Sequence, residues 1–353
     1  MKGVVRRLRP LVSPRVYCLT GTPVSESPTN AYPILSVLAA DRLPSRAKFD
    51  QHFVIRMPVQ AGTVVINKAV AYSNLEELKR MLEAISVRRL KVDIQGMPPK
   101  TEDTRFCVAT SDQADHYAEI MKGVLAQIEG DPDWANSLDI ACVKLLRARQ
   151  VLNHPGVLGL TGDSGKYREL DGILDEVLSD DDAKVVVWTE WNRAVDLLAE
   201  RYRGYGVVTI DQRATQQDLA RLEQTFDRSD VRVVVATPAK GGTGVDFLAR
   251  ARTAIYIEKT YSLVNHRQSI DRIVRRVADD NAADTPEAGK VKRIKRSAAT
   301  VLYLHVPGSV DDVVGWVLQR KLDLGDALLT SDERLLADGK DHLIAMLRER
   351  TKL

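Results

Sequence analysis

The sequence predicts an α/β protein in which a doubly wound parallel sheet follows a more helical N-terminal part. Two observations lead to this prediction. From Ser164 onward, short β-branched runs that are apolar on both faces alternate with amphipathic helical segments. Before that point, helical periodicity dominates and strand-like runs are isolated. With 353 residues, the chain is long enough for two core-forming domains.

The composition is that of an ordinary globular protein, with 44% apolar and 28% charged residues. The net charge is only +3, so any nucleic-acid surface must be local, and the 5% aromatic content argues against a surface built on base stacking. The three cysteines, Cys18, Cys107 and Cys142, lack the spacing of a disulfide or zinc framework and favour a reducing, intracellular setting. No apolar run approaches the ~18 residues of a membrane span, so no membrane partner is expected.

The N-terminal part begins with a strand-like run over Val16–Leu19, which leads through a Thr-Gly-Thr-Pro turn into a helix over Ala31–Ala40. A charged, mostly helical stretch ends with Leu75–Ile94, and the two prolines that follow break it. Residues 103–111 resume as a strand, and residues 113–158 form two helices. We expect His154, next to a proline, to be a structural turn residue at the end of the second helix.

Five runs predict the strands of the doubly wound sheet, and each is followed or preceded by a helical pattern. These runs are Lys184–Thr189, Gly206–Asp211, Arg232–Thr237, Thr253–Glu258 and Thr300–Val306. The segment Ala278–Ala298 has no periodicity and shifts from acidic to basic, so we interpret it as a solvated loop. Trp188 and Trp191 flank a strand end and are expected to pack in the interior.

A helical pattern over Asn265–Asp280 carries the most informative charges. At 100° per residue, Ile270, Ile273, Val274 and Val277 form one stripe, and Gln268, Arg272 and Arg275 lie on the opposite face. Planar guanidinium donors suit phosphate oxygens, and an arginine inserted across a cleft can stabilise charge on a transferring phosphoryl group. The alternative is a basic solvent-facing side of an amphipathic helix.

A glycine-rich turn follows the predicted strand at Arg232–Thr237. In Lys240-Gly241-Gly242-Thr243-Gly244, the glycines allow backbone N–H groups to approach a phosphate closely. The carboxyl ends of parallel strands are also where such sheets place their ligands. On these grounds alone, a tight turn and a phosphate site stay equally open.

Taken in order, these segments closely resemble the C-terminal part of the Swi/Snf-like family of superfamily-two helicases, which are ATP-driven DNA translocases and remodellers. The resemblance covers essentially the whole chain, and its ordered combination is more specific than any single motif. The matching segments are Thr20-Gly21-Thr22-Pro23 (motif III), Val87–Glu102, Leu145–Leu158, Ala236–Phe247 (motif V) and Gln268–Arg275 (motif VI). After motif VI, the chain has Arg276-Val277-Ala278 where the family usually has Ile-Gly-Gln.

The resemblance implies a partial first RecA-like lobe over residues 1–112, a helical linker over 113–160, a second RecA-like lobe over 161–325 and a helical tail over 326–353. It implies that Arg275 is an arginine finger, and that Arg272 and Gln268 position it or contact ATP phosphates. It places Gly242, Gly244 and Asp246 in a nucleotide-sensing loop and Thr20, Gly21 and Thr22 in a coupling motif. The DNA-binding residues that it implies, together with the best local basic patch, are Thr189, Thr237, Lys240, Lys292, Arg293, Lys295 and Arg296; the alternative for the basic patch is a solvated loop.

The phosphate loop G-x-x-x-x-G-K-S/T and an acidic strand end for Mg²⁺ are not found in the sequence. Gly162–Lys166 is too short and is followed by Tyr167, so we interpret it as a helix start. Asp175 and Glu176 lie within a helical pattern. We therefore expect a motor cut inside its first lobe, with Val16–Leu19 and Arg105–Ala109 as strands of an incomplete sheet.

We therefore expect that the chain binds ATP and Mg²⁺ only when the missing first-lobe motifs are supplied. These motifs would come from a P-loop-containing N-terminal partner polypeptide or from upstream sequence. The isolated chain is expected to be inactive. Duplex DNA, bound through its phosphates and without sequence reading, is the expected nucleic-acid partner. The alternative is an ATPase-dead DNA-binding or regulatory remnant.

Overall fold

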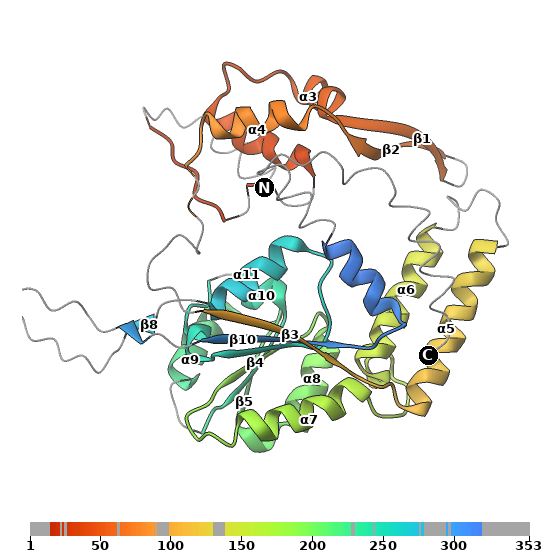
Figure 1. Ribbon diagram of the computed structural model, residues 1–353, viewed down its shortest axis with the longest axis vertical. Coiled ribbons are helices and arrows are strands. Elements are labelled where there is room, and N and C mark those ends of the chain that lie inside the picture. The colour runs from red at the N-terminus through yellow and green to blue at the C-terminus, as the bar shows by residue number, and fades with distance from the viewer. Residues whose placement is uncertain are drawn as a thin grey trace, which may run out of the picture.

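The computed structural model of the protein describes residues 15–21, 23–24, 27–61, 64–87, 89, 99–129, 138–226, 230–242, 244–274, 277–278, 294–295 and 298–319. Its main body is a six-stranded sheet in the order β3-β10-β7-β4-β6-β5, with helices on both faces (Figure 1). All neighbouring strands of this sheet are parallel. The predicted α/β class with a doubly wound parallel sheet is therefore confirmed.

Five of the six strands form where the sequence predicts them. They are β4 (Val185–Trp188), β5 (Val207–Ile210), β6 (Val233–Ala236), β7 (Thr253–Tyr256) and β10 (Ala299–His305). Their side chains are apolar in succession because both faces of a parallel sheet are covered. In β4, Val185 and Val187 join one buried cluster, and Val186 and Trp188 join the other.

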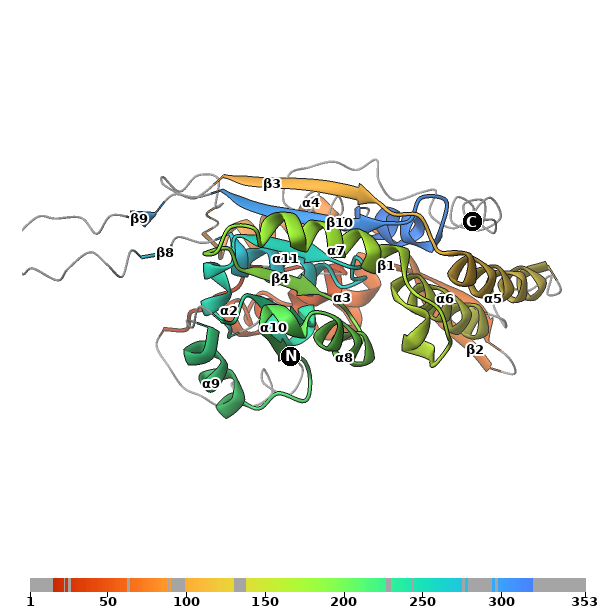
Figure 2. The ribbon, with the colours of Figure 1, turned by 90° about the horizontal axis from the view of Figure 1, so that it is seen from below.

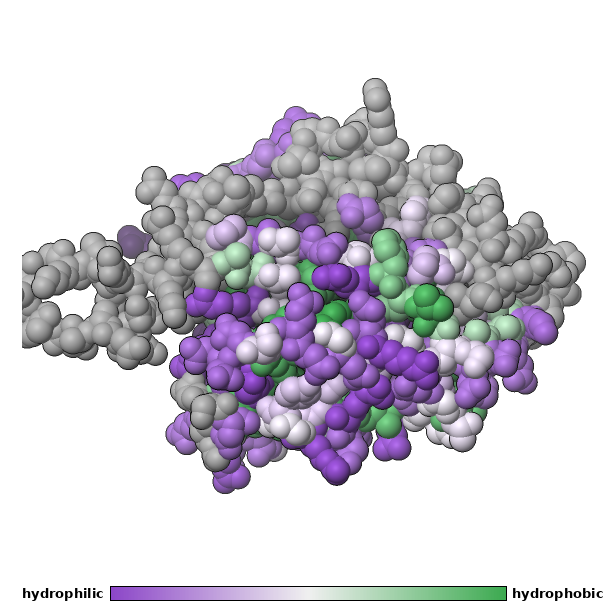
Figure 3. Space-filling model, turned by 60° about the horizontal axis from the view of Figure 1, so that its bottom comes forward, coloured by the Kyte–Doolittle hydropathy of each residue, from purple (hydrophilic) through white to green (hydrophobic). Residues whose placement is uncertain are grey.

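Helices from different parts of the chain cover the two faces. On one face lie α7 (Gly165–Val177) and α8 (Asn192–Arg201), joined by α5 (Ser111–Glu129) and α6 (Leu138–Asn153). On the other face lie α9 (Gln216–Phe226) and α11 (Leu263–Ile273). The side covered by α7 and α8 presents mainly hydrophilic residues with scattered apolar ones (Figure 3).

Short elements complete the sheet domain. They are η4 (Pro155–Leu158), η5 (Arg203–Tyr205), α10 (Pro238–Gly241), η6 (Phe247–Arg250) and a helix over 310–319. As expected, His154 caps a turn, because its Nδ1 accepts a hydrogen bond of 2.9 Å from the Gly156 N–H. Trp188 is fully buried, also as expected.

The sixth strand, β3 (Lys100–Phe106), belongs to a different sheet from the one predicted. It forms an edge of the six-stranded sheet and pairs in parallel with β10 over its whole length (Figure 2). The strand predicted at Arg105–Ala109 was assigned to an incomplete first-lobe sheet, and that assignment is wrong. The charged sequence of β3 suits an exposed edge, where charge discourages pairing with further strands.

A separate small core is formed near the N-terminus. It involves η1 (Pro28–Ala31), α2 (Tyr32–Leu38), α3 (Arg46–Phe53) and α4 (Leu75–Glu83), whose buried residues are Val24, Ala31, Leu35, Phe49, Phe53, Leu78 and Leu82. Between α3 and α4 lies an antiparallel hairpin of β1 (Val54–Ala61) and β2 (Val64–Tyr72), which the sequence analysis missed.

The strand predicted at Val16–Leu19 does not form. These residues lie outside helices and strands, and Leu19 is 97% exposed. A strand needs a neighbour for its N–H and C=O groups, and none of the sheets in the described residues pairs with this segment. The predicted loop at 278–298 is also partly wrong, since β8 (Val277–Ala278) pairs antiparallel with β9 (Ile294–Lys295). Among the described helices, none has the length and apolarity to span a bilayer.

Candidate functional site

The carboxyl ends of β4, β6 and β7 bring two predicted site residues, Thr189 and Thr237, and an unpredicted one, Glu258, to one edge of the sheet. Thr189 follows β4, Thr237 follows β6, and Glu258 lies just beyond β7. The glycine-rich turn continues from β6 through α10, and α11 begins six residues after Ile257. The ligand-binding edge of a parallel sheet is thus the place where the predicted motifs V and VI meet.

Arg272 joins the two motifs directly. Its Nε donates a 2.9 Å hydrogen bond to the Gly242 carbonyl oxygen, and its Nη1 donates a 2.5 Å hydrogen bond to Oδ1 of Asp246. The Arg272 side chain is 15% exposed, whereas that of Asp246 is 71% exposed. The ion pair is therefore open to solvent on one side and contributes at most about 1 kcal/mol to stability. It nevertheless fixes the direction of a guanidinium that faces the glycine-rich turn.

Gly242 has to be small at this contact. A Cβ at this position would lie 2.4 Å from the Pro238 carbonyl oxygen and 3.5 Å from the Gln268 Cβ. The absence of that carbon allows the turn to close on the Pro238 carbonyl, whereas the distance to Gln268 on α11 is an ordinary van der Waals contact. Gln268 is half-buried. Gly244, two residues on, is exposed and has a φ of +70°, a conformation that favours glycine.

Buried polar contacts hold α11 in place on the sheet. The Tyr256 hydroxyl on β7 and the Ser269 hydroxyl on α11 lie 2.7 Å apart. His266 Nε2 lies 3.3 Å from the Tyr303 hydroxyl on β10, and burial lowers the pKa of His266 to about 4. The neutral imidazole therefore acts as a packing group beneath α11 across the physiological pH range.

The helix ends earlier than the pattern predicted. α11 stops at Ile273, and Val277 lies in β8 instead of on the helical stripe. Arg275 lies outside the described residues, as do Thr22, Thr243, Lys292, Arg293 and Arg296. Gln268, Arg272, Gly242 and Asp246 are brought together, and the role of Arg275 stays a prediction.

The predicted DNA contacts differ in their accessibility. Thr189 and Thr237 are buried and present no side-chain surface to a duplex in this conformation. Lys240 is half-buried at the glycine-rich turn, and Lys295 lies in β9. Thr20 and Gly21 are exposed and lie outside helices and strands.

A buried glutamate stands at the centre of a hydrogen-bond cluster that the sequence analysis did not find. Glu258 accepts hydrogen bonds from Asn153 Nδ2 (2.5 Å), Thr189 Oγ1 (2.9 Å) and the Glu190 N–H (2.5 Å). Burial raises the pKa of Glu258 to about 7, against the opposing influence of Lys166 and the hydrogen bonds. The one available signal was a glutamate directly after the apolar run of β7.

Lys166 forms a second buried contact at the same edge. It is fully buried at the start of α7, and its Nζ lies 2.6 Å from Oδ2 of Asp311 and 2.9 Å from the Ile257 carbonyl oxygen. The interpretation of Lys166 as a helix-start residue is confirmed, and its ion pair ties α7 to the helix over 310–319. An ammonium buried in this way requires its counter-charge.

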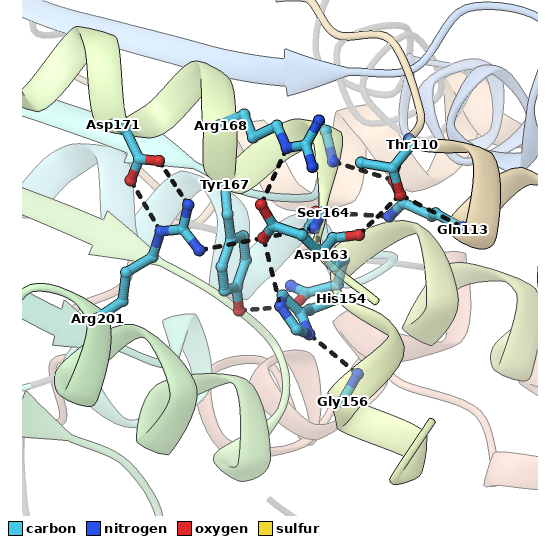
Figure 4. Close-up of polar contacts among 12 residues, drawn as sticks. Thr110, Gln113, His154, Gly156, Asp163, Ser164, Tyr167, Arg168, Asp171 and Arg201 are labelled. Carbon is cyan, nitrogen blue, oxygen red and sulfur yellow. Dashed lines mark hydrogen bonds and ion pairs between the residues drawn. The ribbon is translucent and has the colours of Figure 1, made fainter. Parts of the chain in front are cut away.

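Figure 4 shows how the segment after α6 is held on α7 and α8. Asp163 accepts hydrogen bonds from Arg168 Nε (2.9 Å) and Arg201 Nη1 (3.1 Å), and these guanidiniums together with the Ser164 N–H lower the pKa of its carboxyl. Arg201 also forms a bidentate pair with Asp171 on α7. The printed polar contacts of Asp163, Asp171 and Arg201 are with neighbouring residues of this cluster, so we assign the cluster to structure.

The donor set at motifs V and VI fits a phosphate better than a metal. A guanidinium that is 15% exposed and lies beside a glycine-rich turn, in which Gly242 is buried and Gly244 is exposed, is suited to phosphate binding. Within the described residues, no group of three His, Cys, Asp or Glu side chains is placed to hold a metal ion.

Comparison with known proteins agrees with the motif order. Residues 4–157 match the SNF2-related domain family, and residues 165–277 match the helicase conserved C-terminal domain family. The chain belongs to the Swi/Snf-like superfamily-two helicases. The two matched regions of this Swi/Snf-like chain adjoin at the start of α7, and the resemblance given by the motifs is confirmed.

Curated relatives are longer than this Swi/Snf-like chain. It is 26% identical over 351 residues to the ISWI chromatin-remodeling complex ATPase CHR17 of Arabidopsis thaliana, covering 94% of this chain and 30% of that protein. It is 24% identical over 277 residues to the SWI/SNF-related matrix-associated actin-dependent regulator of chromatin subfamily A member 1 of Homo sapiens, covering 73% of this chain and 25% of that protein. The chain thus spans about 30% of the length of the first of these relatives.

A solved structure supports the fold. The SWI2/SNF2 ATPase core of Sulfolobus solfataricus in complex with dsDNA aligns with a TM-score of 0.52 at 18% identity, covering 91% of this chain and 63% of that one. At this identity the likeness concerns the RecA-like fold alone.

Proposed function

We propose that the chain supplies the second-lobe motifs of an ATP-dependent DNA translocase of the Swi/Snf-like type. The observation that carries the proposal is the contact of Arg272 with Gly242 and Asp246 at the carboxyl edge of the sheet. A guanidinium held against a glycine-rich turn is suited to bind phosphate oxygens and to respond when a nucleotide arrives.

In this function, Gln268, Arg272 and the turn at Gly242–Asp246 face the ATP phosphates, and Arg275 acts as the arginine finger. A phosphoryl transfer site also needs a P-loop and an acidic strand end for Mg²⁺, and neither motif is found in the 353-residue sequence. We propose that a P-loop-containing polypeptide or segment completes the site, and that the chain by itself does not hydrolyse ATP.

The DNA partner is proposed to be duplex and to be held through its phosphates. Lys240 at the glycine-rich turn and the basic run Lys292–Arg296 supply the cations, with the coupling motif at Thr20–Thr22 linking DNA to nucleotide. Phosphate contacts fix the position of a protein on DNA without reading its sequence, and their number sets the salt dependence of binding. The setting is proposed to be intracellular, at DNA.

The test begins with isolation of the natural assembly. The gene is expressed from its own locus with a tag after Leu353, and the masses of the tagged product and its copurifying polypeptides are measured. The expected result is a P-loop-containing product or partner whose purified assembly hydrolyses ATP in response to duplex DNA.

The same assay gives the outcome that would overturn the proposal. Arg275→Ala is expected to abolish hydrolysis in the assembly, whereas Arg203→Ala, at an exposed residue paired with Glu200, leaves it unchanged. Robust DNA-stimulated hydrolysis by the pure 353-residue chain would refute the need for a P-loop partner. An assembly without hydrolysis would support the ATPase-dead remnant instead.

A further inference from the structure

Two buried polar residues of α6 face the carboxyl edge of the sheet. Arg149 and Asn153 lie four residues apart, so they share one face of the helix. Arg149 is 3% exposed and Asn153 is fully buried. A buried arginine and a buried asparagine need hydrogen-bond partners. Arg149 Nε has no partner in the described residues, whereas the donors Arg149 Nη2 and Asn153 Nδ2 find partners in the loops after β4 and β7.

The Arg149 guanidinium is enclosed by the loops that follow β4 and β7. Its Nη2 donates a 2.8 Å hydrogen bond to the Lys259 carbonyl oxygen and lies 3.6 Å from the Glu190 carboxylate. Its Cζ lies 4.4 Å from the Tyr261 ring centroid and 5.4 Å from that of Trp191. A planar cation that stacks on an aromatic ring and donates at its edge fixes both loops in one arrangement.

Asn153 reaches the same two loops. Its Nδ2 lies 3.0 Å from Thr189 Oγ1 and 2.5 Å from Glu258 Oε2. Its Oδ1 accepts a 3.1 Å hydrogen bond from the Tyr167 hydroxyl, which fixes the orientation of the amide. Glu258 is therefore the shared acceptor of donors from α6 and from the loop after β4, and a reversed amide would lose the two bonds that Asn153 Nδ2 donates.

The loop after β7 leads directly into the helix of motif VI. Lys259 and Tyr261, which Arg149 contacts, lie within four residues of Leu263, the first residue of α11. Ser262 caps that helix by accepting a hydrogen bond from the Asn265 N–H. A displacement of residues 258–261 would therefore move the first turn of α11 and, with it, Gln268 and Arg272.

We propose that Arg149 and Asn153 are positioning residues for the nucleotide-facing helix. Through the loops after β4 and β7, α6 sets where α11 holds Arg272 against the turn at Gly242–Asp246. Any effect of these residues on ATP turnover rests on the proposed function. The structural link from α6 through the two loops to α11 does not.

Hydrogen exchange of the full chain tests the link. In Arg149→Met, which keeps the apolar stem, we expect amides in residues 257–273 to exchange about tenfold faster than in the wild type, while α6 keeps its protection. Arg147→Met is the matched control, because Arg147 is exposed on the same helix and bonds only Gln150 in the described residues. Exchange in Arg149→Met within about twofold of the control would overturn the proposal.

Swapping the amide and the carboxyl group between positions 153 and 258 distinguishes a polar positioning contact from simple packing. Asn153→Asp places two carboxylates together, and Glu258→Gln removes the acceptor for Asn153, so each variant is expected to raise exchange in residues 257–273. In the double variant, the introduced amide donates to the introduced carboxylate, and exchange returns to within about twofold of the wild type. If the amides of residues 257–273 in the double variant exchange as fast as the two single effects together predict, the positioning role of the Asn153–Glu258 contact is refuted.

The outcomes also distinguish this proposal from the proposed function. If both exchange experiments behave as expected but the natural assembly shows no DNA-stimulated ATP hydrolysis, the function fails and the link stands. If the assembly hydrolyses ATP and Arg149→Met matches Arg147→Met in both exchange and kcat, the link fails and the function stands.

Discussion

The buried carboxyl of Glu258 gives the sharpest prediction about pH. The pKa of Glu258 is raised from 4.5 to about 7, mainly because the side chain is buried. A raised pKa means that the folded protein binds a proton more tightly than the unfolded chain does. Stability therefore falls as pH rises from the unfolded value through the folded one, and the loss is complete above pH 7.

The size of the effect follows from the shift. One pKa unit corresponds to about 1.4 kcal/mol, so a carboxyl whose pKa rises from 4.5 to about 7 makes the protein roughly 2 to 3 kcal/mol less stable at pH 8 than at pH 5. Glu258→Gln removes the titration, and a neutral amide keeps the volume. The stability of the wild type minus that of Glu258→Gln should thus decline by about this amount between pH 5 and pH 8.

Urea unfolding at a series of pH values measures this difference, with the fluorescence of the buried Trp188 as the probe. Other titrating groups are common to both proteins and cancel in the subtraction. Glu176→Gln, at an exposed position of α7, is the matched Glu→Gln control outside the buried cluster. A constant or increasing difference for Glu258→Gln over the same range would refute the raised pKa of Glu258.

Four further substitutions test other features of the molecule. Asp311→Asn leaves the ammonium of Lys166 buried without its counter-charge and should cost about 3 to 5 kcal/mol in urea unfolding, with Lys166→Met in the same chain restoring part of the loss. Gly242→Ala forces a Cβ against a backbone carbonyl 2.4 Å away and should cost about 1 to 3 kcal/mol in thermal unfolding. Gly172→Ala, at an exposed helical site with open space, should instead stabilise by about 0.5 to 1 kcal/mol. In the completed assembly, Arg272→Ala should lower DNA-stimulated kcat about 100-fold or more, as measured by phosphate release.

The local sequence pattern predicted those strands that can be recognised without knowing which strands they pair with. The strands β4 to β7 and β10 are short β-branched runs, and such runs are buried in any parallel sheet. The helix of motif VI was placed correctly, but its end was not. The apolar stripe continues to Val277, which the structure places in β8.

Errors arose where a segment depends on its neighbours. Val16–Leu19 has the composition of a strand, yet no described strand pairs with it, and it stays irregular. The hairpin of β1 and β2 was missed within a stretch interpreted as mostly helical. β3 has a polar sequence that fits either sheet, and only its register with β10 decides where it belongs.

The sequence by itself determined the family, the central strands and the glycine and arginine residues that meet at the carboxyl edge, because these are properties of short segments in a fixed order. The tertiary structure decided the environment of each side chain. Asn153 and Glu258 are 105 residues apart, and Thr189 and Glu258 are 69 apart, so no local pattern could pair them. Where α6 meets the loops after β4 and β7, burial raises the pKa of Glu258 and removes Thr189 from the surface. Both effects depend on the residues that surround a side chain in space and not on its neighbours in the sequence.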